Sequence, residues 1–406
     1  MERISELERR YVLEALENQF RTSKNNVFIG RLEEKFAHLF SRQFAISFCN
    51  GTATLHTALA ALGVKEGDEV IVPPLTMSSP ALAVLHNRSI PVFADVDRQT
   101  FNILPESISQ NITKKTRAVI TVALYGLAPD YDQIQKICKE HNLYLIEDNA
   151  QAFLSKYQGK LVGQFGEFAS FSFQASKHIT CGEGGMLITD SEELADRARR
   201  FASLGYGSVS AQKGRIARRD IQNPNFDRHT TMGFNYRISE LQAACALGQI
   251  ERAEELVAAR VKAAAAFNQI VQEVDWLAPQ AEPQGYLNSY WAYSVVLKVK
   301  DPERAWFRFR HLFLKNGGDG IYAAWKLTYQ EPLFLNEVQN YPGVWQRYER
   351  GLCPNAEYLQ KRMLQFKTNY WELGEVERQA EILKETIKDF ENLYLTRKTT
   401  RVMAGK

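Results

Sequence analysis

The sequence has little of what marks a membrane, secreted or metal-binding protein. No apolar run among its 406 residues approaches the ~20 residues that a transmembrane helix needs. The N-terminal segment over 1–20 is charged and amphipathic and has no signal-peptide core. The five cysteines and seven histidines are scattered without CxxC or metal-type spacing. We therefore expect a cytoplasmic protein with reduced thiols, without a metal site and without a membrane partner.

The chain also lacks an excess of charge of one sign. Fifty Lys and Arg residues face 47 Asp and Glu residues, and the net charge is +3. A nucleic-acid partner is therefore not expected, because such proteins carry a basic excess. The hydrophobic share of 45% is that of an ordinary globular enzyme, and the length leaves room for about two to three domains.

Short apolar segments alternate with helix-length segments through the first two thirds of the chain. The expected strands cover 45–48, 69–74, 91–97, 117–126 and 144–148. Such alternation predicts the α/β class, with a mostly parallel sheet covered by helices on both faces. Ligands in these sheets bind beyond the carboxyl ends of the strands.

The later part of the chain predicts a second, smaller domain. One long helical stretch over 238–271 would connect the two domains. A strand over 289–298, a helix over 303–318 and a final amphipathic helix over 376–395 follow. We expect a large domain over 1–260, a small α+β domain over 261–396 and a disordered tail over 397–406.

The most informative stretch of the sequence runs from Glu147 to Gly185. Asp148 ends an apolar strand, and an alternating Ser/Phe strand leads to Ser172 and Lys177. A glycine-rich turn and a new strand follow. Pyridoxal phosphate (PLP) chemistry needs such groups, because a lysine forms a Schiff base with the aldehyde and a carboxylate keeps the pyridine nitrogen protonated. A single surface lysine or strand-end aspartate is ordinary, but their conjunction before a flexible turn favours a PLP enzyme.

Five motifs in order carry a resemblance to a known family. They cover 49–76, 91–97, 146–152, 165–185 and 233–244. With these motifs the chain resembles the sugar aminotransferases of the DegT/DnrJ/EryC1/StrS family. The resemblance implies a PLP-dependent transaminase of fold type I, the aspartate aminotransferase-like fold, with a mostly parallel seven-stranded-type sheet. It identifies Lys177 and Asp148 as the catalytic residues.

The resemblance also assigns the cofactor contacts. Backbone N–H groups of Gly51 and Thr52 at a helix N-terminus would bind the phosphate, together with the Ser172 hydroxyl. Gln151 would donate to the phenolic oxygen of the ring. Met77 stands where relatives often carry an aromatic ring that stacks on the pyridine, and its thioether can lie against that ring.

Asn235 resembles the residue that reaches the phosphate of the neighbouring subunit. The resemblance therefore implies a homodimer with shared active sites.

Substrate contacts are less well marked in the sequence. Relatives carry a histidine-containing segment near 317–334 that helps to hold a nucleotide-sugar, and here Trp325, Lys326 and Tyr329 stand in that region. Whether the sugar is nucleotide-linked or a sugar acid stays open. A basic group precedes the last motif and includes Lys213, Arg215, Arg218, Arg219 and Arg228. It is either a solvated, mobile loop or an anion clamp in which Arg219 and Arg228 bind a pyrophosphate or carboxylate.

The expected reaction transfers an amino group from glutamate or glutamine to a keto- or aldehydo-sugar. The product would be an amino sugar for a surface polysaccharide, lipopolysaccharide or secondary metabolite. Two alternatives share the scaffold. A sugar dehydratase (a lyase) would carry His at position 177, and a regulatory relative would have lost Asp148 or Lys177. His178 is expected to be structural, because adjacent side chains of an extended segment point in opposite directions.

Overall fold

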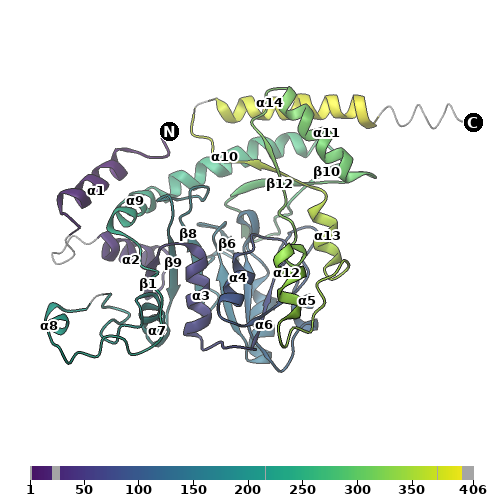
Figure 1. Ribbon diagram of the computed structural model, residues 1–406. Coiled ribbons are helices and arrows are strands. Elements are labelled where there is room, and N and C mark those ends of the chain that lie inside the picture. The colour runs from purple at the N-terminus through teal and green to yellow at the C-terminus, as the bar shows by residue number, and fades with distance from the viewer. Residues whose placement is uncertain (1, 21–27, 215, 373, 396–406) are drawn as a thin grey trace, which may run out of the picture.

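The computed structural model describes residues 2–20, 28–214, 216–372 and 374–395. A large α/β part surrounds a seven-stranded sheet, and a smaller C-terminal part with its own sheet lies above it (Figure 1). The predicted tail over 397–406 and Arg215 lie outside the described residues. Among the described helices, none combines the length and the apolar character that a bilayer crossing requires.

The central sheet confirms the predicted fold class. Its strands in spatial order are β1 (Phe44–Phe48), β9 (Gly185–Thr189), β8 (Phe168–Ser172), β5 (Tyr144–Asp148), β4 (Thr116–Val122), β2 (Glu69–Val72) and β3 (Ile90–Phe93). The run from β8 to β3 is parallel, whereas β9 pairs antiparallel with both β8 and β1. The ends of β5 and β8 therefore meet at one edge, where Asp148 and Ser172 lie.

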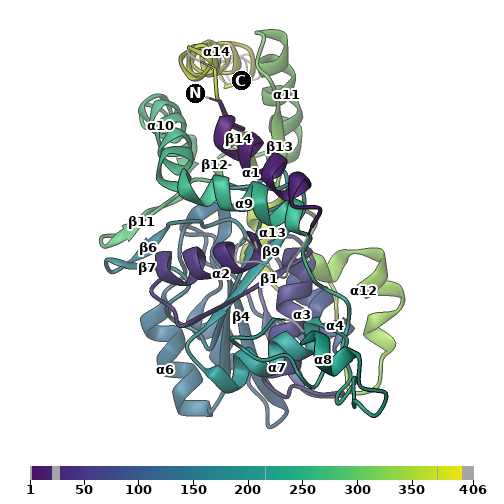
Figure 2. The ribbon, with the colours of Figure 1, turned by 90° about the vertical axis from the view of Figure 1, so that its left-hand side faces the viewer.

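Helices cover both faces of this sheet (Figure 2). Val70 and Val72 face one layer, whereas Ile71 between them faces the other. The first layer contains α3 (Gly51–Ala61), α4 (Ser79–His86) and α7 (Glu192–Ala202). The second contains α1 (Glu6–Glu17), α2 (Phe28–Leu39), α5 (Pro105–Gln110) and α6 (Tyr131–His141). Burial on both faces explains why these strands are almost continuously apolar.

The single long helix expected over 238–271 is wrong. The structure has α9 (Glu240–Glu251) and α10 (Ala253–Val271), separated at Arg252 with φ −111° and ψ 12°. At this break the Arg252 side chain pairs with Glu8 at 2.9 Å and donates to the main-chain oxygens of Glu2 and Arg3. No glycine or proline marks the break in the sequence, because the cause is this distant contact and not local helix propensity.

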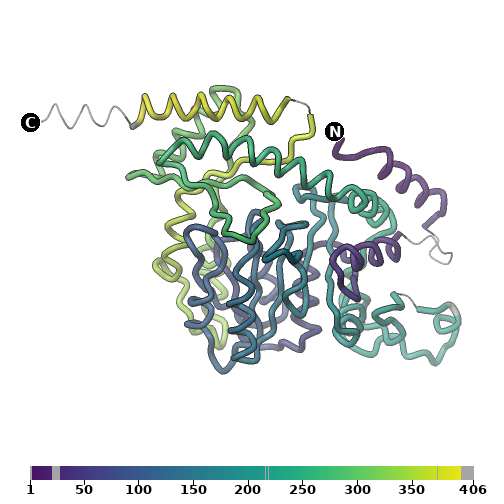
Figure 3. Tube along the Cα trace, turned by 180° about the vertical axis from the view of Figure 1, so that it is seen from behind, coloured from purple at the N-terminus to yellow at the C-terminus, as the bar shows by residue number. Residues whose placement is uncertain are grey.

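The smaller part is built on an antiparallel four-stranded sheet. Its order is β10 (Leu277–Pro279), β12 (Ala292–Leu297), β14 (Met363–Lys367) and β13 (Ile321–Ala323). The helices α10, α11 (Pro302–Lys315) and α14 (Glu375–Phe390) pack on one face of it (Figure 3), and its other face packs against the large part. The boundary predicted at residue 260 falls inside α10 and stays a prediction.

Part of the C-terminal segment returns to the large sheet. Gln346 exchanges hydrogen bonds with the main chain of Phe93 at 2.7 and 2.9 Å. The Asp95 carboxylate accepts from the first N–H groups of α13 (Pro354–Gln360), at Asn355 and Ala356. The remaining short elements are β6 (Lys156–Tyr157), β7 (Lys160–Leu161), β11 (Tyr286–Leu287), α8 (Arg218–Ile221), α12 (Pro332–Asn336), the turns Leu124–Gly126, Thr328–Gln330 and Val338–Asn340, and the π-helical turn Glu391–Leu395.

Candidate functional site

A cavity of about 820 Å³ lies at the carboxyl ends of β5 and β8, between the large and the small sheet. Its lining includes eight residues singled out from the sequence, which are Gly51, Thr52, Met77, Asp148, Gln151, Ser172, Lys177 and Trp325. The remaining lining comes from both parts, with Arg260 of the helix between them and with residues of β12, β13 and β14 on the side of the small part. The volume falls in the range of small-molecule sites, roughly 300–1,000 Å³.

One wall of the cavity is the N-terminus of α3. The Asn50 side chain caps this helix by accepting from Ala53 N at 2.8 Å. The first N–H groups of a helix have no partner within it, so Gly51 and Thr52 offer donors to an anion. A Cβ built at Gly51 would lie 3.0 Å from Ser172 Cβ, so glycine is what lets the helix approach the end of β8. This cradle, with the Ser172 hydroxyl, fits a phosphate group.

Asp148 lies at the end of β5 and is only 6% exposed. Burial raises the pKa of its carboxyl to about 6, although a hydrogen bond from Ala150 N and the positive charge of Lys177 lower it. A buried carboxylate with so few donors favours a cationic partner. A protonated ring nitrogen of a cofactor fits this position.

Lys177 lies on the loop after β8, half-buried in the cavity wall. Burial lowers the pKa of its amine to about 8. The charge of Asp148 opposes this shift, and the charge of Arg260 contributes to it. Its Nζ lies 4.8 Å from the ring centre of Trp291. A larger fraction of this amine is therefore neutral near pH 7 than of an exposed lysine, as a nucleophile or general base requires.

Gln151 is fixed in orientation by the main chain. Its Oε1 accepts from Tyr125 N at 3.0 Å, and the side chain is 2% exposed. The amide nitrogen is therefore the end of the group that is left to donate to a ligand. Tyr125 itself adopts φ +59° and is buried.

Aromatic rings form the side of the cavity that faces the small part. Trp291 and Trp325 both line it, and their centroids are 5.8 Å apart at an interplanar angle of 17°. Tyr125 lies nearly parallel to both, at 6.3 and 6.0 Å. Trp291 was not identified from the sequence, because nothing in the strand that follows it marks a site.

The structure does not bring the other sequence-derived candidates into this cavity. Tyr329 is fully buried and donates to Glu357 at 2.7 Å. Lys326 is half-exposed and lies 4.0 Å from Glu331. His178 is buried, with Nε2 3.0 Å from Ser289 O, in agreement with its expected structural role.

The basic segment and Asn235 also lie away from the cavity of their own chain. Asn235 is exposed, on a segment that pairs with Ser203. Arg219 is 88% exposed at the side chain and lies 3.4 Å from Asp220. Arg228 lines a different cavity.

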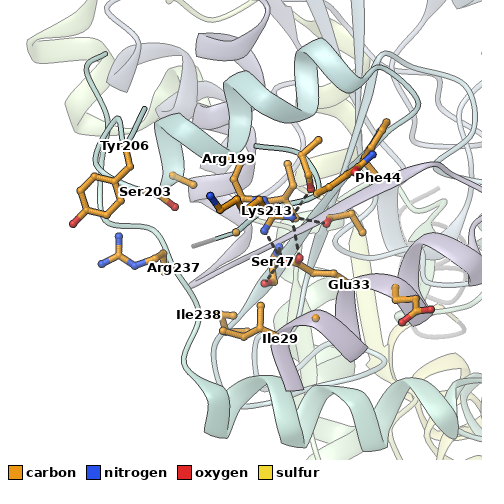
Figure 4. Close-up of a pocket in the computed structure, with 18 of the residues that line it drawn as sticks. Ile29, Glu33, Phe44, Ser47, Arg199, Ser203, Tyr206, Lys213, Arg237 and Ile238 are labelled. Atoms are coloured by element: carbon orange, nitrogen blue, oxygen red, sulfur yellow. Dashed lines mark hydrogen bonds and ion pairs between the residues drawn. The ribbon is translucent and has the colours of Figure 1, made fainter. Parts of the chain in front are cut away.

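That second cavity has a volume of about 1,100 Å³ and lies among α2, β1, α7 and the segment 206–221 (Figure 4). Its central carboxylate, Glu33, is already saturated. Both terminal nitrogens of Arg199 donate to it at 2.9 Å, and the Ser47 N–H and hydroxyl donate at 2.9 and 2.8 Å. The larger cavity is therefore built around a structural ion pair, and Lys213, which lines it, is half-exposed and lies 4.0 Å from Asp220.

Comparison with known proteins shows a similarity that extends over most of the chain. The DegT/DnrJ/EryC1/StrS aminotransferase family matches residues 2–373. The chain is 37% identical over 352 residues to "GDP-perosamine synthase" of Escherichia coli O157:H7, which covers 87% of each chain. It is 35% identical to the "Putative L-glutamine:3-amino-2,3-dideoxy-scyllo-inosose aminotransferase" of Micromonospora echinospora, over 82% of this chain and 78% of the other.

Among solved structures, the aminotransferase from Psychrobacter cryohalolentis superposes with a TM-score of 0.84 at 27% identity, over 95% of this chain and 97% of that one. The similarity thus extends over both the large and the small part of the structure.

Proposed function

Because the chain belongs to the DegT/DnrJ/EryC1/StrS aminotransferase family and is therefore an aminotransferase, we propose that it uses PLP to move an amino group from glutamate or glutamine to a keto- or aldehydo-sugar. The observation that carries the proposal is the single cavity in which Lys177, Asp148 and the N-terminus of α3 face one another. Lys177 also speaks against the dehydratase alternative, which requires His at that position.

The described residues divide the work of this reaction. Gly51, Thr52 and Ser172 bind the phosphate end of the cofactor, and Gln151 donates to its ring oxygen. Asp148 holds a proton at the ring nitrogen. When bound, PLP supplies the electron sink that amino-group exchange requires.

Lys177 is the proton carrier of the proposed reaction. Its Nζ removes the proton from the α-carbon of the amino donor in the first half of the reaction. In the second half it gives a proton to the sugar carbon that receives the amino group. With its pKa lowered to about 8, roughly a tenth of the amine is neutral at pH 7, far more than of an exposed lysine. The rings of Trp291 and Trp325 restrict water on the side of the cavity that faces the small part.

The substrate proposed is a keto-sugar carried on a nucleoside diphosphate, and the product an amino sugar for a surface polysaccharide, lipopolysaccharide or secondary metabolite. The support is the similarity to the GDP-perosamine synthases, which reaches 37% identity in one case and 34% in another. Of the residues proposed for the sugar, Trp325 lines the cavity.

A two-step assay tests the proposed function. Adding glutamate to the PLP-loaded protein should shift its absorbance and release one equivalent of 2-oxoglutarate. Subsequent addition of nucleotide-linked keto-sugars should restore the spectrum and yield an amino sugar detected by mass spectrometry. Free keto-sugars serve as the matched comparison. Absence of a shift with either glutamate or glutamine contradicts the transaminase, and a deoxy product with loss of water would identify the lyase.

We further propose a homodimer in which Asn235 of one chain reaches the phosphate of the other. The part of the chain around α8 extends away from the rest of the molecule (Figures 1 and 3). Apolar side chains are exposed there and on the segment 230–236. Met232 is 81% exposed, and Ile221 and Phe234 are also exposed. Exposed apolar patches of this kind mark contact surfaces. The same arrangement would bring Arg219 and Arg228 toward the entrance of the partner's cavity.

Mixing two inactive variants tests the shared site. An Asn235→Ala chain combined with a Lys177→Ala chain should form a heterodimer with one intact and one doubly defective site. The activity of the mixture should therefore exceed that of both parents, after subunit exchange has been verified with a tagged chain. Exchange without recovery of activity, or an active protein that sediments as a monomer, contradicts the proposal.

A further inference from the structure

Two arginines hold the main chain of the lysine loop, and one of them, Arg260, also lines the cavity. Arg260 Nη2 donates to the carbonyl oxygens of Ser176 and Lys177 at 2.9 and 3.0 Å. Arg3 Nη2 donates to Lys177 O at 3.2 Å and also to Ala175 O. Three successive carbonyl groups, at the residue that carries the reactive amine and the two before it, are therefore bound by guanidinium groups.

Arg260 also connects this loop to the small part. Its Nη1 donates to Trp291 O at 3.0 Å and to Thr368 Oγ1 at 3.2 Å, so one guanidinium serves four acceptors on three segments. Trp291 reinforces the connection, because its Nε1 donates to Ser176 O at 3.0 Å. The loop is thus held between α10 and the strand that follows Trp291.

The charges of the two arginines are not neutralised by a carboxylate. In the part of the chain that the structure describes, neither forms an ion pair, and Arg260 is 1% exposed. All the acceptors that they bind are neutral. A buried guanidinium without an anion is unfavourable for folding. Packing alone therefore does not explain why α10 carries an arginine at this position.

The N-terminal segment is fixed so that Arg3 reaches the loop. A capping box of Ser5 and Glu8 begins α1, and Glu8 pairs with Arg252 at 2.9 Å. Gln249 Nε2 donates to Arg3 O at 2.8 Å. The break between α9 and α10 thus fixes residues 2–8, and this anchoring directs the side chain of Arg3 toward Ala175 and Lys177.

We propose that Arg3 and Arg260 form a paired-arginine clamp, two positioning residues that fix the Lys177 loop against the small part, and that the uncompensated charge of Arg260 disfavours the protonated form of the Lys177 amine. The inference rests on the proposed role of Lys177. It extends that role, because it assigns a function to two residues that hold the loop through its main chain.

The charges around Lys177 predict the direction in which the pKa of its amine changes when an arginine of the clamp is replaced. After burial, Asp148 is the largest influence on the pKa of the amine and raises it, Arg260 lowers it, and Glu183 raises it. The clamp also depends on geometry, because the planar guanidinium group of arginine can donate to several carbonyl oxygens at once, whereas the ammonium group of lysine cannot replace all of these contacts. Charge and geometry can therefore be separated by two substitutions at one position.

The experiment measures the apparent pKa of the Lys177 amine in the cofactor-free protein. Reductive methylation is carried out across a pH series, and mass spectrometry follows the peptide that contains Lys177. Arg260→Gln should raise the apparent pKa of Lys177 by about one unit, because a nearby cation disappears. Arg260→Lys should leave this pKa within a few tenths of a unit of the wild type, yet lower kcat of the loaded enzyme at least about tenfold through loss of the multiple contacts.

Lys262→Gln is the matched control, because it removes a positive charge from an exposed position of the same helix. It should leave both measurements unchanged. Arg3→Gln should raise the pKa by less than Arg260→Gln, since Arg260 and not Arg3 is among the charges that lower the pKa of Lys177. A labelling profile of Arg260→Gln that matches that of Lys262→Gln would overturn the proposal.

If Arg260→Gln does not fold, the Arg3→Gln variant serves as the test of the clamp. Wild-type labelling and wild-type kcat in that variant would overturn the clamp. Failure of the proposed function has a different signature. In that case borohydride trapping in the wild-type protein attaches the cofactor to another lysine, whatever the arginine variants show.

Discussion

Lys177→Ala is expected to lose turnover by at least about four powers of ten, because the substitution removes both the nucleophile and the proton carrier. The fold should persist, since the side chain lies on the cavity wall and in the described structure forms no ion pair. Borohydride reduction of the PLP-loaded wild-type protein, followed by peptide mapping, should place the phosphopyridoxyl mass on Lys177. The variant should show no such mass.

Lys326→Ala is the control for this experiment. That lysine is half-exposed, lies near the cavity in sequence order, but does not line it. Its removal should leave the trapped mass and the turnover within about twofold of the wild type. A phosphopyridoxyl group on Lys326 or on any lysine other than 177 contradicts the assignment of the site.

The sequence was sufficient to predict the central sheet and eight of the residues that line the cavity. Buried parallel strands are short apolar runs, and their alternation with helices leaves few topologies. Asp148 and Ser172 lie at the ends of strands, and Lys177 follows a strand by a few residues. These strands are clear apolar segments in the sequence. Local patterns therefore locate them, and the shared cavity confirms that they converge.

Contacts between distant segments could not be predicted in this way. The break at Arg252 depends on Glu8, 244 positions away, and the environment of Lys177 depends on Arg3 at the other end of the large part. Arg260 did carry a signal, because helical spacing places it on the same face as the buried Leu256 and Ala264. A charged residue on an apolar face is unusual, and its partners could only be identified in the folded chain.

The segment 325–329 illustrates the same limit at short range. Trp325 lines the cavity, but Tyr329 points into the core and donates to Glu357, while Lys326 faces solvent. Tyr329 lies within the turn Thr328–Gln330, which follows Trp325 and Lys326. Sequence proximity to a motif therefore predicted one contact of the three within this chain.

Asp148→Asn is expected to lower turnover by several powers of ten while the cofactor-free protein stays as stable as the wild type or becomes more stable. The variant keeps the shape of the side chain and its acceptor for Ala150 N. It removes the negative charge that holds a proton at the ring nitrogen, and charge stabilisation of this kind contributes several kcal/mol. Steady-state kinetics with glutamate measure the first effect, and urea unfolding without cofactor measures the second.

The stability effect follows from the direction of the carboxyl pKa. Burial raises that pKa from 3.8 to about 6, so the folded protein binds a proton there that the unfolded chain has released. Unfolding free energy attributable to this group is highest below pH 4 and decreases as pH rises through 6, by about 2–3 kcal/mol. The asparagine variant lacks this decrease.

The difference in unfolding free energy between the Asp148→Asn variant and the wild-type protein should therefore increase between pH 4 and 6, in favour of the variant, and stay constant above that range. In the same variant the pKa of Lys177 should fall below about 8, since Asp148 raises it, which is opposite to the shift expected for Arg260→Gln. Near-normal turnover in the variant, or a stability difference that does not change with pH, would show that Asp148 is not the buried carboxylate that this chemistry requires.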